Sequence, residues 1–94
     1  MELQQIKQFR EIARTENISK AAEALGLTQA TLSQNLKRLE DELGVQLFER
    51  VGKKLIINKA GEIMYRHCDE ICTTNDTLTA ELAEYKGEEK KRLQ

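Results

Sequence analysis

Short and mostly uncharged side chains gather on one face of the segment 29–43. At 100° per residue, a helix here places its leucines on one face and these short side chains on the other. An amide such as that of Gln29 can bond adenine N6 and N7 together, and the methyl groups of Ala30 and Thr31 suit the thymine methyl group. No Arg or Lys precedes Lys37 in this segment, so bidentate reading of guanine is unavailable from its first turns. The candidate DNA contacts are Thr28, Gln29, Ala30, Thr31, Ser33, Gln34, Lys37 and Arg38.

The residues before this segment predict a second, shorter helix. Ser19 is a candidate N-cap for it, and Gly26 is expected to end it with a positive φ. Thr28 then caps the longer helix over 29–43, which Gly44 closes. Two helices joined in this way form a helix-turn-helix, which places its second helix in the major groove of DNA.

The flanking segments complete a small, mainly α-helical domain. An apolar stripe at helical spacing predicts an amphipathic helix over residues 2–16. Residues 47–50 and 55–57 read as two short strands around the basic turn 51–54, a β-hairpin that we call the wing. An ordinary solvated turn would also be rich in Lys, but beside a helix-turn-helix the wing is expected to contact phosphates. The candidates there are Arg50, Lys53 and Lys54.

A long helix is expected from an N-cap at Asn58 to about Tyr85, with Gly87 ending it. Apolar residues recur along it at intervals of seven, which implies a partner helix because no core in this chain could cover them all. The dimerisation candidates are Met64, Ile71, Leu78, Leu82 and Tyr85. Less apolar residues interrupt the stripe, and these are His67, Cys68, Thr74 and Asn75. The pattern therefore favours an antiparallel or splayed helix pair over a parallel zipper.

Composition bounds the class of protein. The 94 residues, with 4% aromatic residues, suffice for one small core. The net charge of −1 counts against nucleic-acid binding if taken globally. Residues 1–57 carry nine basic and eight acidic residues, whereas residues 58–94 carry six basic and eight acidic residues. Basic residues can therefore still form a patch near the helix-turn-helix. A signal-peptide pattern and a membrane-length apolar run are both missing, so a cytoplasmic protein without membrane contact is expected.

Other functions find less support in the residues. Cys68 and Cys72, with His67 beside them, could offer ligands to a metal, but structural zinc needs about four ligands, so packing in the seam between long helices is favoured. A single His and the lack of a Gly-rich phosphate loop predict no catalytic residue and no enzyme.

A winged helix that serves only as a protein-docking module remains the alternative function. Its third helix would then dock a protein partner, and aromatic or Met anchors would be expected on the exposed face of 29–43. That face is small and polar instead. Salt separates the two functions, because DNA binding weakens steeply with ionic strength and a docking surface responds much less.

Taken together, these segments resemble the amino-terminal domain of LysR-type transcriptional regulators over roughly residues 1–86. The resemblance includes Ser-Lys-Ala-Ala-Glu-Ala-Leu from Ser19 and Thr-Gln-Ala-Thr-Leu-Ser-Gln from Thr28. The other matching segments are 1–9, 39–50 and 60–61.

The resemblance implies a winged helix-turn-helix followed by a linker helix that pairs antiparallel with its mate. It also implies binding to an inverted repeat that begins with T and ends with A, with Gln29, Thr31, Ser33 and Gln34 facing the major groove and Arg50, Lys53 and Lys54 at the wing. Two positions depart from the family pattern. Ala30 replaces a common Pro, and Gln34 replaces a common Arg, which removes one cationic contact.

The expected organisation has three parts. Residues 1–58 form the DNA-binding domain, residues 59–87 the linker and dimerisation helix, and residues 88–94 the start of an effector-binding domain that this fragment lacks. The resemblance implies a small-molecule inducer for that missing domain and a higher oligomer for the full-length protein, whereas no cofactor or metal is expected in the fragment. The predicted function is regulation of transcription by a homodimer bound to an A/T-weighted inverted repeat in double-stranded DNA.

Overall fold

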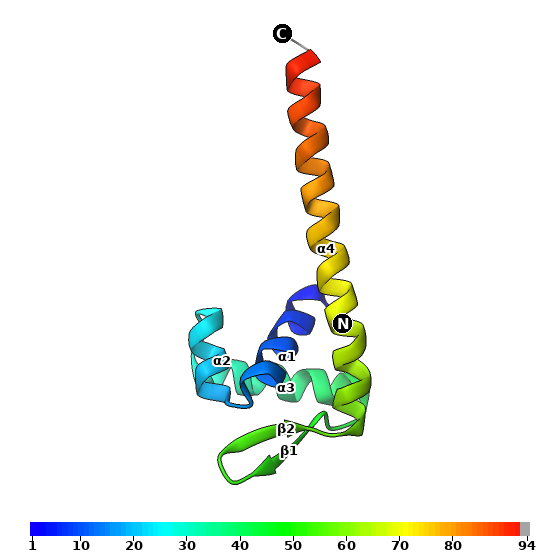
Figure 1. The fold of residues 1–94 in the computed structure, drawn as a ribbon. Coiled ribbons are helices and arrows are strands. Elements are labelled where there is room, and N and C mark those ends of the chain that lie inside the picture. The colour runs from blue at the N-terminus through cyan, green and yellow to red at the C-terminus, as the bar shows by residue number, and fades with distance from the viewer. Residues whose placement is uncertain (93–94) are drawn as a thin grey trace.

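The computed structural model describes residues 1–92 as a small helical head from which one long helix projects (Figure 1). The molecule measures 60 Å along its longest axis. The mainly α architecture with a two-stranded wing is confirmed. The elements in chain order are α1 (Leu3–Thr15), α2 (Ile18–Leu25), α3 (Gln29–Leu43), β1 (Phe48–Val51), β2 (Lys54–Ile57) and α4 (Lys59–Arg92).

The expected cap of α3 and the expected glycine ends of α2 and α3 are confirmed. Thr28 caps the helix, since its side chain accepts a hydrogen bond from the Thr31 N–H group. Gly26 and Gly44 follow α2 and α3 with φ of 69° and 75°, a conformation that glycine adopts without steric cost. The chain therefore turns sharply on both sides of α3.

The expected cap of α2 is wrong by two residues. Asn17, in an extended conformation, is the N-cap, and its Oδ1 atom accepts a hydrogen bond of 3.0 Å from the Lys20 N–H group. Ser19 lies inside the first turn instead. Both residue types are good caps, and the choice follows from where α1 ends: Glu16 takes a left-handed conformation with φ of 54°, which leaves the next residue to begin α2.

One hydrophobic core joins all the elements of the head to the base of α4. The rings of Phe9 and Phe48 lie 5.3 Å apart between α1 and the wing. The buried residues are Ile6, Phe9, Ile12, Ala21, Ala22, Leu32, Leu39, Leu47, Phe48, Leu55, Cys68 and Cys72. The first turns of α4 therefore belong to the packing of the head.

The two cysteines lie elsewhere than expected. Cys68 and Cys72 are each 1% exposed and form part of the core of the single chain, where α1 packs against α4. The prediction that they pack in a seam between long helices is therefore wrong. They share one face of α4 because they are four residues apart, and that face meets α1.

Close packing fixes the junction between the wing and α4. The Asn58 side chain caps α4 by accepting from the Gly61 N–H group at 2.9 Å, and its Nδ2 donates to the Gln46 carbonyl group at 2.9 Å. A Cβ atom on Gly61 would overlap the Leu47 carbonyl oxygen and would lie 2.9 Å from Ile57 Cβ. Only glycine fits between these groups.

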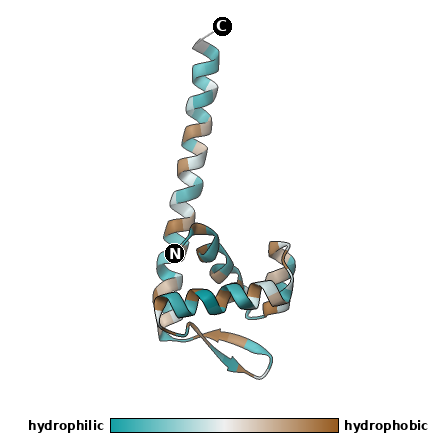
Figure 2. Cartoon of the chain, turned by 180° about the vertical axis from the view of Figure 1, so that it is seen from behind, coloured by the Kyte–Doolittle hydropathy of each residue, from teal (hydrophilic) through white to brown (hydrophobic). Residues whose placement is uncertain are grey.

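The end expected for the long helix is also wrong. Gly87 does not end α4, which continues to Arg92. Glycine ends a helix when it takes a left-handed conformation, but the helical conformation costs only about 1 kcal/mol relative to alanine. Hydrophobic bands recur along the otherwise hydrophilic outer part of α4 (Figure 2). Within residues 1–92, no helix is both long and apolar enough to cross a membrane.

We expect Gly61→Ala to lower the free energy of unfolding by about 1–3 kcal/mol, because the new methyl group overlaps backbone that cannot move freely. Gly87→Ala is the matched control: its site is open, so the same change should raise stability by about 0.5–1 kcal/mol. Urea unfolding at one protein concentration measures both. Equal midpoints for Gly61→Ala and the unmodified chain would contradict the tight junction.

Candidate nucleic-acid interface

The face of α3 opposite its core side is exposed throughout. Leu32 and Leu39 are buried beneath the helix, whereas every candidate contact on it is exposed. The Thr28 hydroxyl group donates to the Thr31 hydroxyl group at 2.8 Å, so these two side chains hold each other at the start of the helix. The exposed candidates are Thr28, Gln29, Ala30, Thr31, Ser33, Gln34, Lys37 and Arg38.

The orientation of α3 on the head depends on a polar contact that no sequence pattern indicated. Asn35 Nδ2 donates to Gln8 Oε1 at 3.1 Å, and Gln8 is 8% exposed. A polar pair in this position disfavours sliding of α3 over α1, because either side chain alone would be left unsatisfied. A second unpredicted contact lies nearer the exposed face, where the Ser19 hydroxyl group donates to Gln29 Oε1 at 2.9 Å.

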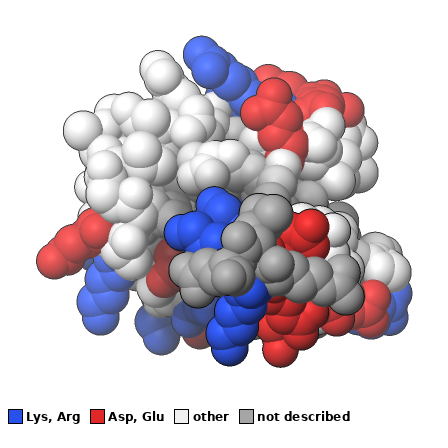
Figure 3. Space-filling view, turned by 90° about the horizontal axis from the view of Figure 1, so that it is seen from above, with Lys and Arg blue, Asp and Glu red and all other residues white. Residues whose placement is uncertain are grey.

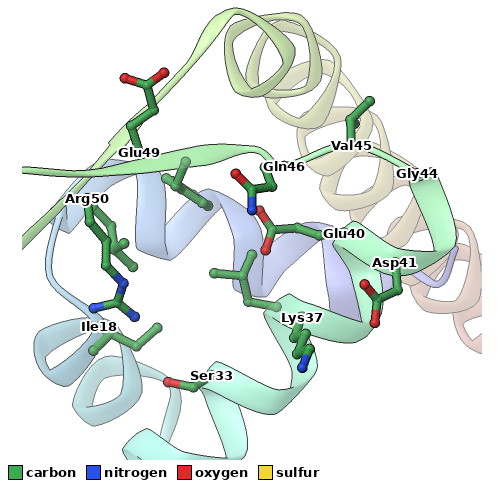
Figure 4. A pocket seen from close by; sticks show the side chains of 13 residues that line it. Ile18, Ser33, Lys37, Glu40, Asp41, Gly44, Val45, Gln46, Glu49 and Arg50 are labelled. Carbon is green, nitrogen blue, oxygen red and sulfur yellow. The ribbon is translucent and has the colours of Figure 1, made fainter.

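An open groove of about 1000 Å³ separates α3 from β1. Ser33 and Lys37 line it from α3, and Arg50 extends toward Ser33 and Ile18 from β1 (Figure 4). Glu49 also lines the groove from β1, but its side chain points away from that of Arg50, as expected for neighbours on a strand (Figure 4). The groove therefore brings a wing cation, Arg50, together with the candidate contacts of α3.

The tip of the wing carries the two lysines. Val51 pairs with Lys54 across a turn formed by Gly52 and Lys53, and Gly52 has φ of 63°. Lys53 and Lys54 are both exposed. They lie at the free end of the hairpin and outside the set of groove residues that contains Arg50.

Acidic groups near the far end of α3 are partly occupied by other contacts. Glu40 Oε2 accepts from the Leu47 N–H group at 2.7 Å, and Glu42 pairs with the Met1 amino group at 2.7 Å. The hydrogen bond from that amino group, and its positive charge, lower the pKa of Glu42. Asp41 lines the groove near Lys37. On the face seen down α4, acidic and basic side chains are intermingled (Figure 3).

The dimerisation candidates divide into two groups. Met64 packs against the core of its own chain. Ile71 and Leu78 are 41% and 53% exposed, and Leu82 and Tyr85 are exposed as well. Ile63, which the heptad pattern did not include, is also exposed.

The buried thiols are poorly suited to bind a metal. Burial raises the pKa of the Cys68 thiol to about 11, which disfavours the thiolate that metals bind. His67 is exposed, whereas both cysteines face the core. Over residues 1–92, no three His, Cys, Asp or Glu side chains converge as a metal site would require.

Comparison with known proteins gives a consistent result. A family model described as bacterial regulatory helix-turn-helix protein, lysR family, matches residues 3–62. The HTH-type transcriptional regulator YtlI of Bacillus subtilis (strain 168) is 42% identical over 89 residues, which cover 95% of this chain and 29% of that protein. The HTH-type transcriptional activator CmpR of Synechocystis sp. is 38% identical over 91 residues, or 97% of this chain and 30% of that protein. The chain thus spans less than a third of the length of these relatives.

Solved structures of DNA complexes share the fold. The BenM DBD/catB site 1 DNA complex matches with a TM-score of 0.86 at 27% identity, over 89% of this chain and 93% of that one. The CbnR DBD–DNA complex matches with a TM-score of 0.82 at 26% identity, over 89% of this chain and 97% of that one.

Proposed function

This chain belongs to the lysR family of bacterial helix-turn-helix regulators, and from that premise we propose that it binds an A/T-weighted inverted repeat in DNA as a homodimer. Members of this family are DNA-binding regulators of transcription and not enzymes. The observation that carries the proposal is the exposed, uncharged start of α3, where Gln29, Ala30 and Thr31 stand clear of the core. Short side chains there permit close approach to base edges.

The chemistry of these first turns supports an A/T-weighted site. The Gln29 amide matches the N6 and N7 atoms of adenine, and the methyl groups of Ala30 and Thr31 match that of thymine. Lys37 and Arg38 lie two turns further along α3, where they suit phosphates better than base edges. Two structures with the same fold are DNA complexes, which supports DNA binding by this chain.

Cations around the groove and the wing supply the proposed phosphate contacts. Arg50 and Lys37 border the groove from opposite sides, and Lys53 and Lys54 extend from the tip of the wing. Contacts of this kind orient a protein on DNA without reading the sequence.

The outer part of α4 supports the proposed dimer. Large apolar side chains at Ile71, Leu78 and Tyr85 recur every seven residues and are exposed in the single chain. A second copy of the helix would cover them. Two half-sites bound together then give an affinity that one weakly charged head could not reach alone.

Replacing Lys53 and Lys54 with Ala should weaken binding to all DNA sequences about equally. The slope of log affinity against log salt should fall by roughly one unit for each phosphate that a lysine no longer neutralises. Replacing Lys90 and Lys91, at the far end of α4, makes the same change in net charge and is the control. Fluorescence anisotropy titrations over a range of salt concentrations give the slopes. An unchanged slope in the wing variant would show that the wing does not touch DNA, and a flat salt response of the unmodified chain would favour the protein-docking function.

Gln29→Ala should cost about 1–3 kcal/mol on the specific site and little on random DNA, because the variant removes only hydrogen bonds to a base. Gln34→Ala, also on the exposed face, should have a smaller effect. Selection from a random DNA pool, with each variant, identifies the half-site and the base pair that Gln29 reads. Enrichment of G·C-rich half-sites whose preference survives Gln29→Ala would contradict the proposal.

Ile71→Asp or Leu78→Asp should yield monomers, because each would bury an unpaired charge in the helix pair at a cost of several kcal/mol. The monomers should also bind DNA weakly, since they engage one half-site at a time. Thr73→Asp adds the same charge on the opposite face of α4 and should remain dimeric. Sedimentation velocity distinguishes the states, and dimeric Ile71→Asp and Leu78→Asp variants would place the interface elsewhere.

A further inference from the structure

A hydrogen bond joins the first turns of the two helices of the helix-turn-helix. The Ser19 hydroxyl group, in the first turn of α2, donates to Oε1 of Gln29, the first residue of α3, at 2.9 Å. Ten residues separate the two along the chain. Both side chains are exposed, so this bond is not needed to satisfy a buried group.

Both partners are held by well-anchored backbone. Asn17 caps the turn of α2 that carries Ser19, and Ala21 and Ala22 fix that helix to the core at 0% and 2% exposure. Thr28 caps α3 directly before Gln29. The hydroxyl group and the amide therefore meet across a rigid turn, and the bond holds the otherwise rotatable glutamine side chain in the orientation seen, with Oε1 toward Ser19.

The chemistry of the amide gives this orientation a consequence. Oε1 has two lone pairs and Nε2 has two N–H donors. When Ser19 occupies one lone pair of Oε1, the other can accept from adenine N6 while Nε2 donates to adenine N7. An amide rotated by 180° presents its donor where adenine also has a donor. A hydroxyl group can also accept from Nε2 of the rotated amide, so Ser19 fixes the place of the amide rather than the end that faces DNA. With Oε1 toward Ser19, as in the structure, the amide complements adenine.

We propose that Ser19 is a positioning residue that strengthens the base preference of Gln29 by holding its amide in place through this hydrogen bond. The inference rests on the proposed function, because it requires that Gln29 read a base. Water competes for the hydroxyl group in the free protein, so the bond contributes little to stability there. Bound DNA would exclude water from the site. Without Ser19, the Gln29 amide would then lose this hydrogen bond and no water molecule could replace it.

The test compares four forms of the full chain: unmodified, Ser19→Ala, Gln29→Ala and the double variant. The readout is discrimination, the ratio of affinities for the selected half-site and for the same site changed at the base pair that Gln29 reads. Ser19→Ala should reduce this ratio about three- to tenfold, the value of one hydrogen bond. Ser19→Thr, which keeps the hydroxyl group, should retain most of it. In the Gln29→Ala background, Ser19→Ala should change the ratio no further.

Each other outcome has a definite meaning. A uniform loss of affinity on all sequences in both backgrounds would show that Ser19 contacts phosphate, which overturns its positioning role. An unchanged ratio in Ser19→Ala, where Gln29→Ala does reduce it, would also overturn the inference while leaving the proposed function intact. If Gln29→Ala itself changes no base preference, the proposed reading by Gln29 fails, and the role of Ser19 fails with it.

Discussion

The close approach of Gly61 to the Leu47 carbonyl group fixes the direction in which α4 leaves the head. Asn58 reinforces this direction, because its side chain caps α4 and also donates a hydrogen bond to the Gln46 carbonyl group. From this junction α4 runs back along α1, and Cys68 and Cys72 fill the space between the two helices. The wing, the core and the projecting helix are consequently one packed unit. The exposed face of α3 and the outer part of α4 hold fixed positions relative to each other.

Local signals predicted much of this fold. Thr28, Gly26 and Gly44 mark the ends of the helices because capping and left-handed turns depend on neighbouring residues alone. The exposed face of α3 was predictable because the helical period alone separates its leucines from its short polar residues. Local signals failed where two neighbouring residues could serve as the cap, so that α2 begins after Asn17 and not after Ser19. Distant packing decided the place of the cysteines of α4, which face α1. At the candidate site, the bonds from Ser19 to Gln29 and from Asn35 to Gln8 join separate helices, so no pattern along the chain could show them.

The distribution of charge on the head suits discrimination between DNA sequences more than strong binding to any DNA. Uncharged groups stand at the start of α3, and the cations lie further along it and on the wing. Two of the nearby acids are engaged, Glu40 by a backbone N–H group and Glu42 by the Met1 amino group. A surface of this kind gains little affinity from charge alone, so most of the proposed specificity falls to a few short side chains and to the simultaneous use of two heads.

The 34 residues of α4 give the proposed dimer a geometric sensitivity. From Leu78, at the centre of the proposed pairing positions, to Lys59 at the head, α4 is about 28 Å long at 1.5 Å per residue. A change of about 5° in the angle at which two such helices cross would displace a head by roughly 2.5 Å, which is most of the rise of one base pair, about 3.4 Å. Because α4 and the head are packed as one unit, the helix acts as a lever. A small rotation at the pairing helices would therefore shift the two reading surfaces relative to each other by a large part of one step of the duplex.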